Sequence, residues 1–200
     1  MHEIGQIKLL QVQQSPLKIK QQPYGYYDPT PLLVVESLLL SPDGVIGVTS
    51  DNRHIMDIHH AHHRASRNIE GLNGLSIGFT SHYESMRGKF GDHVMDGCAG
   101  ENILVEAATT LTLDDLGRRL AIQSQRTGRL IYLTRPMIAA PCVEFTHFAA
   151  GQGRDLPAGQ LKEALQFLDD GRRGFYATIV DQGNEMVVQA GDRLFVDDGW

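Results

Sequence analysis

Between residues 102 and 133 the chain reads Asn102-Ile103-Leu104-Val105, then Arg119-Leu120-Ala121-Ile122, then Arg129-Leu130-Ile131-Tyr132-Leu133, with polar or glycine-bearing turns between these runs. Short apolar runs bounded by turn residues are typical of β-strands. The segment from Cys142 to Phe148 extends the series as a fourth predicted strand. This part of the chain is therefore expected to form sheet.

The same pattern continues on both sides of this region. Ser41-Pro42-Asp43-Gly44 is a turn signal, because proline presets φ and glycine accepts a positive φ, and it predicts a hairpin. Residues 24–31 combine turn formers with aromatic residues and are expected to form a loop that lies across the body of the fold. The other predicted strands are 7–14, 17–20, 32–40, 45–48, 75–78, 174–180, 186–189 and 192–196.

Helical signals are few. One helix is predicted at about 82–90, where Ser81 and Glu84 have the spacing of a capping box and Gly91 ends the apolar face. A second is predicted from about residue 156 to Gly171, with Asp155 as a candidate cap. Many short strands with only two or three short helices indicate a mainly β fold, a barrel or a sandwich. We expect residues 1–31 to lead into a barrel domain that spans residues 32–200.

Composition limits the partners and the compartment. The chain has 200 residues, 42% of them hydrophobic, and a net charge of -6. An acidic chain without clustered Lys and Arg is not expected to bind nucleic acid. No apolar run is long enough to span a bilayer and no leader is evident, so we expect a cytoplasmic protein that does not enter membranes. Its two cysteines, Cys98 and Cys142, are expected to be free thiols there.

Five motifs occur in a specific order along the chain: Gly100-Glu101-Asn102-Ile103, Asp114-Asp115-Leu116-Gly117, Pro141-Cys142, Gly174-Phe175-Tyr176-Ala177 and Ala190-Gly191-Asp192. In this order and with these gaps, they resemble the MOSC family, named for the C-terminal domain of molybdenum cofactor sulfurase. The resemblance spans about residues 34–196. It implies a β-barrel related to the barrel of pyruvate kinase.

The resemblance also implies chemistry. At the position of Cys142 the family has a cysteine that binds the molybdenum of a pterin-dithiolene cofactor, the molybdenum cofactor, or that carries sulfur. Its characterised members reduce small N-hydroxylated substrates. A thiolate suits molybdenum because sulfur is a soft ligand. Two cysteines cannot build a four-cysteine iron–sulfur cluster, and no flavin or haem motif is present, so a separate electron-donor protein is expected.

Three residues are candidates to assist Cys142. Asn102 offers both a donor and an acceptor to a cofactor and is the favoured site residue, while Glu101 could bond pterin nitrogens; alternatively, the two residues only stabilise a tight turn. Arg135, seven residues before Cys142, could supply the positive charge that favours a thiolate. Cys98 is either a resolving thiol for Cys142 or a packed side chain.

Asp51-Asn52-Arg53-His54 resembles an acidic, basic and histidine segment of the family, although Ser50 replaces the usual glycine. If the likeness holds, Arg53 and His54 contact the cofactor phosphate or the substrate and Asp51 orients them. Otherwise the segment is a surface turn.

Residues 54–63 hold five of the nine histidines. On a helix, His59 and His63 would share a face at the i, i+4 spacing of two histidines that bind zinc or nickel. Asp57 or His60 would be a third ligand. The alternative is a solvated loop at the mouth of a pocket. Gly171-Arg172-Arg173-Gly174 also has two interpretations. It is either an anion-binding site or a pair of cations that interact with the helix dipole at a C-terminus.

The sequence therefore predicts a molybdenum-dependent reductase of N-hydroxylated small molecules. Two other functions stay open. In one, Cys142 carries a persulfide for the assembly of metal–sulfur cofactors. In the other, the chain is a metal- or ligand-binding module without catalysis.

Overall fold

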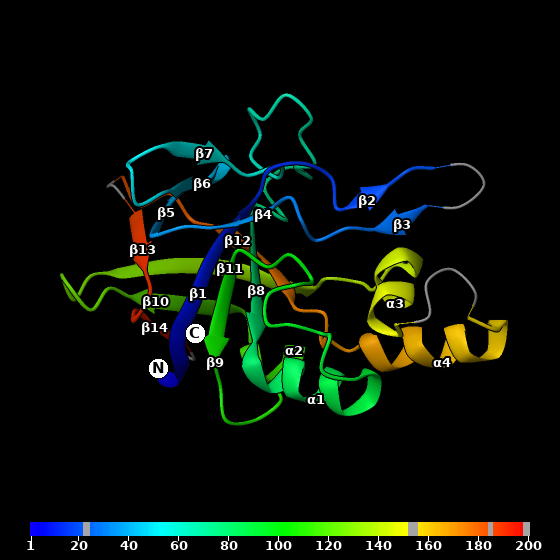
Figure 1. The fold of residues 1–200 in the computed structure, drawn as a ribbon. Coiled ribbons are helices and arrows are strands. Elements are labelled where there is room, and N and C mark those ends of the chain that lie inside the picture. Colours follow the sequence, from blue (N-terminus) through cyan, green and yellow to red (C-terminus); the bar gives the residue numbers. More distant parts are fainter. Residues whose placement is uncertain (22–24, 152–155, 184–185, 198–200) are drawn as a thin grey trace.

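Seven strands close into a barrel in the computed structural model, which describes residues 1–21, 25–151, 156–183 and 186–197 (Figure 1). The order around the barrel is β14-β10-β11-β12-β8-β9-β1, and β1 pairs with β14 to close it. Of these neighbouring pairs, only β8 and β9 run parallel. The bounds are β1 His2–Gln13, β8 Leu75–Phe79, β9 Ile103–Glu106, β10 Arg119–Gln123, β11 Leu130–Ile138, β12 Phe175–Ile179 and β14 Arg193–Val196. The predicted mainly β barrel is confirmed.

The barrel encloses one large apolar core. Alternate residues of its strands point inward, so Leu120, Ile122, Leu133 and Leu194 are almost fully buried on neighbouring strands. Fully burying one such side chain contributes about 1.5–3 kcal/mol. Residues 1–13, which the sequence places ahead of the barrel, supply one of its strands, since β1 lies between β9 and β14.

A smaller sheet of four strands lies against one end of the barrel, in the order β13-β5-β6-β7 (Figure 1). Its bounds are β5 Ser37–Ser41, β6 Gly44–Val48, β7 His54–Met56 and β13 Met186–Gln189. The hairpin predicted at residues 41–44 joins β5 to β6. The prediction of one strand over residues 32–40 is wrong, because the chain changes sheets there: β4 (Leu32–Val34) pairs with β1, and the amide of Glu36 already bonds to Val48 in the second sheet.

A short hairpin projects from the barrel beside the helices. It consists of β2 (Lys18–Ile19) and β3 (Tyr26–Tyr27), so the predicted loop at 24–31 contains a strand. Tyr27 is buried, and its ring packs edge-on against Phe145 at 5.1 Å between centroids. This contact holds the hairpin against the body of the fold.

Four short helices complete the described structure: α1 Thr80–Phe90, α2 Leu113–Leu116, α3 Val143–Ala149 and α4 Ala158–Leu168. The predicted helices at 82–90 and 156–171 correspond to α1 and α4. Ser81 does not cap α1, because the helix already begins at Thr80 and the Ser81 hydroxyl donates to Thr109 O at 2.8 Å. Asp155, the candidate cap of α4, lies outside the described residues.

The strand predicted from Cys142 to Phe148 is wrong, since this segment is helix α3. Cys142 is its N-cap, and the Cys142 sulfur accepts from the amide of Phe145 at 3.4 Å. The hydroxyl of Thr146 bonds back to Cys142 O at 2.8 Å. Phe145 and Ala149 recur at helical spacing and are both fully buried. These local bonds and this buried face outweigh the strand preference of Val143, Phe145 and Thr146.

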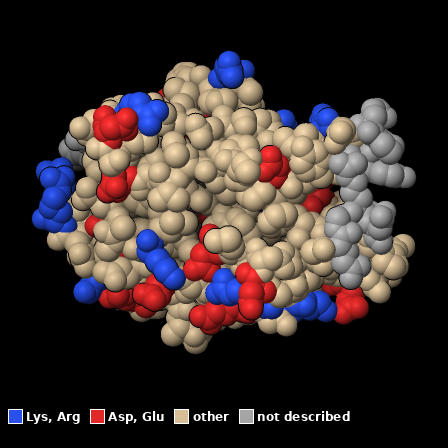
Figure 2. Space-filling model, in the orientation of Figure 1, with Lys and Arg blue, Asp and Glu red and all other residues tan. Residues whose placement is uncertain are grey.

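Positive and negative side chains are interspersed on the face shown in Figure 2. Within the described residues, the chain has no helix with the length and hydrophobicity needed to traverse a lipid bilayer.

Candidate functional site

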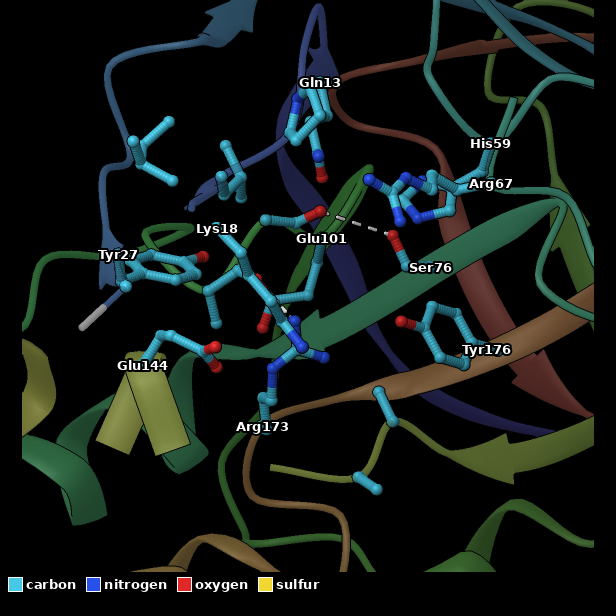
Figure 3. Close-up of a pocket in the computed structure, with 18 of the residues that line it drawn as sticks. Gln13, Lys18, Tyr27, His59, Arg67, Ser76, Glu101, Glu144, Arg173 and Tyr176 are labelled. Carbon is cyan, nitrogen blue, oxygen red and sulfur yellow. Dashed lines mark hydrogen bonds between the residues drawn. The ribbon is translucent and has the colours of Figure 1, made fainter. Parts of the chain in front are cut away.

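A cavity of about 500 Å³ lies between the end of the barrel, the β2–β3 hairpin and α3. Figure 3 shows side chains from all three parts around it. This volume is in the range of cavities that bind small molecules and cofactors. The residues that could contact a ligand through charged or polar groups are Gln13, Lys18, Lys20, Gln21, Tyr27, His59, Arg67, Ser76, Glu101, Glu144, Arg173 and Tyr176.

Two of the five ordered motifs line this cavity, and a third follows directly after two of its lining residues. Gly100 and Glu101 line it from the loop before β9, and Phe175 and Tyr176 line it from β12. Ala139 and Ala140 line it just ahead of Pro141-Cys142. The motifs at 114–117 and 190–192 lie elsewhere: the first forms α2, and the Asp192 carboxylate accepts from the amides of Gln125 and Gln189.

Glu101 is the most buried acidic group of the cavity, with a residue exposure of 3%. One of its carboxylate oxygens, Oε2, accepts from the Tyr83 hydroxyl at 2.7 Å. The other, Oε1, is buried and has no hydrogen-bond partner in the described part of the chain. Burial raises the pKa of Glu101. The hydrogen bond from Tyr83 and the charge of Arg173 lower the pKa by a smaller amount, so that it stays above its ordinary value.

Two glycines make room for this carboxylate. A Cβ on Gly78 would lie 2.6 Å from Glu101 Oε1, and one on Gly174 would lie 3.2 Å from it. Gly174 also has a φ of +110° and sits where a Cβ would meet Ile77 O at 2.8 Å. The glycine of the Gly174-Phe175-Tyr176 motif is therefore required by its positive φ and by the close approach of Ile77 O and the Glu101 side chain.

Gly174→Ala is expected to lower the free energy of unfolding by about 3 kcal/mol, because it adds a clash with backbone to a strained φ. Gly128→Ala is the matched control, since Gly128 also has a positive φ (+69°) but a Cβ added there would have no neighbouring atom within 4 Å. That variant should lose only about 1 kcal/mol. Equal losses in urea titrations of the two variants would contradict the proposed close contact.

The two arginines at 172 and 173 have different roles. Arg172 donates to Phe167 O at 2.9 Å and lies over the Phe167 ring. Its positive charge therefore interacts favourably with the C-terminal end of α4. Arg173 turns into the cavity, where it donates to Ala99 O at 3.3 Å. Its Nε is buried and has no hydrogen-bond partner in the described structure. Arg172 therefore matches the helix-terminus interpretation, whereas an anion site at Arg173 stays a prediction.

Cys142 lies at the edge of the cavity rather than in its wall. It is partly buried against the aromatic cluster of α3, and it is close enough to Arg173 and Tyr27 for its charge to act on both. Cys98 is buried, and burial raises its pKa to about 12, so its thiol stays neutral. Of the two thiols, Cys142 is the one suited to bind a metal or carry sulfur.

The side-chain amide of Asn102 makes all its hydrogen bonds inside the fold. Its Oδ1 accepts from the amide and the hydroxyl of Ser76, at 3.0 and 2.9 Å. Its Nδ2 donates to Gln11 O at 3.2 Å and to Asp57 Oδ2 at 2.9 Å. A primary amide has two donors and two acceptor sites, so no capacity is left for a cofactor. Of the two neighbours, Glu101 reaches the cavity and Asn102 ties β1, β8 and β9 together.

The other predicted cofactor contacts lie away from the cavity. Arg135 is exposed at a bulge of β11, with a φ of +51°, and Arg173 is the cation near Cys142 instead. Asp51, Arg53 and His54 are exposed around the turn between β6 and β7, where Asp51 pairs with Arg53 at 2.8 Å. Their positions match the alternative that residues 51–54 form a surface turn.

The histidine-rich segment does not form the helix that would align His59 with His63. It consists of β7 followed by turns. His59 Nδ1 lies 3.0 Å from Asp57 Oδ1, and His60 Nδ1 accepts from the amide of His62. Across the described ranges, no group of three or more His, Cys, Asp or Glu side chains is placed to hold a metal ion. His59 and Arg67 instead line the cavity, and the segment is a loop rather than a helix.

Several cavity residues have no signal in the sequence. Lys18 and Lys20 belong to a two-residue strand and its continuation, Arg67 follows the histidines, and Glu144 lies in the segment predicted as a strand. None belongs to a motif, and only the folding of the β2–β3 hairpin over the barrel end brings them together. The Arg-Arg pair at 172–173 was the available signal for Arg173.

No protein-family model matches the chain, and no curated protein matches it in sequence. Solved structures do resemble it. The YuaD protein from Bacillus subtilis has a TM-score of 0.54 and 16% identity, over 96% of this chain and 97% of that one. A protein described as hypothetical covers 93% of this chain and 68% of its own, with a TM-score of 0.48 and 13% identity. YiiM from Escherichia coli also has a TM-score of 0.48, with 14% identity over 83% of this chain and 65% of YiiM. The chain therefore shares the fold of YuaD over nearly its whole length.

Proposed function

We propose that this chain is a MOSC-type protein that binds a molybdenum cofactor in the cavity through Cys142 and reduces small N-hydroxylated molecules. The observation that carries the proposal is that Gly100-Glu101 and Phe175-Tyr176 line one cavity, together with Ala139 and Ala140, which directly precede Pro141-Cys142. These motifs lie far apart in the sequence, and each has a separate place in the resemblance to the family. The fold shared with YuaD is compatible with this assignment.

The residues present suit such a cofactor. Cys142 offers a soft sulfur ligand for molybdenum at the edge of the cavity. Glu101 Oε1 and Arg173 Nε are buried polar atoms without partners in the described structure, and a pterin with its nitrogen and oxygen edge would satisfy both. Lys18, Lys20 and Arg67 line the same cavity and suit a phosphate group.

Once bound, the cofactor would supply two-electron oxygen-atom chemistry. The other contributions to the site come from residues of the chain itself. Arg173 supplies a fixed positive charge beside Cys142, and the β2–β3 hairpin and α3 contribute side chains to the wall of the cavity. The electrons come from a separate donor protein, as the sequence predicts.

Arg173→Ala is expected to lower cofactor retention at least tenfold, because a charged hydrogen-bond donor contributes about 1.5–3 kcal/mol. The test uses protein from a host that makes the cofactor. Molybdenum per chain is measured by elemental analysis, and the pterin is measured by fluorescence after oxidative release.

Arg172→Ala is the matched control, since Arg172 bonds to the end of α4 and does not line the cavity. It should retain the cofactor as wild type does. Equal retention by Arg173→Ala and wild type would contradict the placement of the cofactor in this cavity.

A further inference from the structure

We propose that His59 and Arg67 form the phosphate site of the cavity, and that the buried Asp57 is the positioning residue that turns the His59 imidazole toward the ligand. This inference rests on the proposed function, which places the cofactor phosphate in this cavity, and it names the side chains that bind the phosphate. Figure 3 shows His59 and Arg67 reaching into the cavity from the same side.

A closed loop brings these two side chains together. The Arg67 amide donates to Ile58 O at 2.8 Å, so the intervening segment leaves the body of the fold and returns at the same point. His59 and Arg67 stand at this point, one at each end of the loop. His59 O accepts from Asn68 Nδ2 at 2.8 Å, and Arg67 O accepts from Asn73 Nδ2 at the same distance. The backbone of both residues is therefore fixed.

Asp57 decides which nitrogen of His59 faces the ligand. Burial raises the pKa of the Asp57 carboxyl, but hydrogen bonds from His59 and Gln13 outweigh burial, and the group stays ionised. An ionised carboxylate only accepts hydrogen bonds, so the 3.0 Å contact between Asp57 Oδ1 and His59 Nδ1 requires the proton on Nδ1. The His59 amide donates to the same oxygen at 2.8 Å. Nε2 is thereby left as the nitrogen for a ligand.

The groups offered to the ligand are unpaired and accessible. In the described part of the chain, neither His59 Nε2 nor the Arg67 guanidinium has a hydrogen-bond or ion-pair partner. The His59 side chain is 18% exposed and Arg67 is an exposed residue, so a molecule in the cavity can contact both. Arg53, by contrast, is already paired with Asp51.

The charge of the cavity also favours an anion. The whole chain has a net charge of -6, yet the described lining carries four cations against two carboxyl groups, which are Lys18, Lys20, Arg67 and Arg173 against Glu101 and Glu144. Burial raises the pKa of Glu101, which reduces the negative charge of the lining further. Figure 3 shows Glu144 on the side of the cavity opposite His59.

An arginine beside a histidine of this kind suits a phosphate monoester. The guanidinium offers parallel donors to two phosphate oxygens. A third oxygen shares one proton with His59 Nε2: a dianionic phosphate accepts it from the imidazolium, and a monoanionic phosphate donates it to the neutral ring. In both forms Nδ1 keeps its proton and its bond to Asp57. The position of the ring is therefore the same for both forms.

Phosphate binding by the full chain without cofactor tests the site. The protein is made in a host that lacks the cofactor, and inorganic phosphate is titrated in a calorimeter. We expect saturable binding that His59→Gln and Arg67→Gln each weaken at least tenfold, the scale of a lost hydrogen bond to a charged group. Arg67→Lys should recover part of the affinity, because it keeps the charge but not the planar fork.

His62→Gln and Arg64→Gln are the matched controls. Both residues are exposed in the same loop and do not line the cavity, so their variants should bind phosphate as wild type does. Weakening by the controls equal to that by His59→Gln and Arg67→Gln would show a general effect of loop charge and would overturn the site.

A double-mutant cycle tests the role of Asp57. Asp57→Asn should weaken phosphate binding in wild type but cause no further loss in His59→Gln, because Asp57 acts through His59. Independent losses in the two backgrounds would overturn the positioning role. Nitrogen-15 NMR of the wild-type imidazole should show the proton on Nδ1 of His59, and this measurement does not require Asp57→Asn to fold.

Protein loaded with the cofactor identifies the source of the phosphate. If the cofactor phosphate occupies the site, loaded wild type should bind no added phosphate, and Arg67→Gln should retain less molybdenum and pterin than Arg64→Gln. Undiminished phosphate binding by loaded wild type would overturn the assignment to the cofactor and give the site to a phosphorylated substrate.

The site itself is overturned if cofactor-free wild type binds no phosphate, if His59→Gln and Arg67→Gln bind it as wild type does, or if Nδ1 of His59 carries no proton. Absence of molybdenum from wild type would overturn the proposed function instead. The phosphate titration needs no molybdenum, so the two failures are distinguishable.

Discussion

Asn102→Ala is expected to lower the free energy of unfolding by about 4 kcal/mol. The substitution removes four side-chain hydrogen bonds, two with Ser76 and one each with Gln11 and Asp57. Each buried group left without a partner costs about 1–3 kcal/mol. The loss is large beside the roughly 5–15 kcal/mol that stabilise a typical domain.

Asp57 makes this cost higher than that of an ordinary buried asparagine. Asp57 is 2% exposed. Burial raises the pKa of its carboxyl, but hydrogen bonds from His59 and Gln13 and the charge of His59 lower this pKa overall. The carboxylate is therefore charged in the fold and depends on its donors, of which Asn102 is one. Losing a donor leaves a buried charge less well paired.

Urea unfolding at neutral pH measures the loss. Asn102→Asp should be at least as destabilised, because it places a second carboxyl beside Asp57, and its deficit should shrink as the pH falls and one carboxyl takes a proton. Asn68→Ala is the control: Asn68 is partly buried and bonds only backbone groups, so we expect a loss of about 1 kcal/mol. A loss below about 1 kcal/mol for Asn102→Ala would contradict the structural role.

The strands were predictable because their signal is local. Runs such as Leu120-Ala121-Ile122 carry their apolar residues and turn boundaries within a few positions, and this run forms the barrel strand β10. The segment 142–149 has equally strand-like residues, yet forms α3. Its helix is stabilised by the Cys142 cap and by contact with Tyr27, which is distant in the sequence, and a local pattern does not contain that contact.

The site was predictable in part for the same reason. The motifs located Cys142 and Glu101 at the edge and in the wall of the cavity. They favoured Asn102, whereas Glu101 is the residue that lines the cavity, because the outcome depends on which side chain faces Ser76 and Asp57 from other parts of the fold. Arg135 is suggested by its nearness to Cys142 in sequence, whereas the turn after α4 brings Arg173 close to Cys142 in space.

Cys142→Ala is expected to remove at least nine-tenths of the bound molybdenum. Alanine has no donor atom, and even the loss of groups that only support a metal ligand typically costs about 10–100-fold in affinity. The effect on stability should be small, since Cys142 is partly buried and its sulfur accepts one long bond, 3.4 Å from the amide of Phe145. Cys98→Ala is the matched control, because the buried Cys98 thiol has its pKa raised to about 12 by burial and does not line the cavity.

The most direct test is elemental analysis of wild type, Cys142→Ala and Cys98→Ala, each purified from a host that makes the cofactor. We predict molybdenum near one per chain in wild type and Cys98→Ala, and a tenfold or greater loss in Cys142→Ala. Equal molybdenum in all three would contradict the claim that Cys142 is the ligand. Little molybdenum in wild type, together with cyanide-labile sulfur that disappears in Cys142→Ala, would identify a sulfur carrier instead.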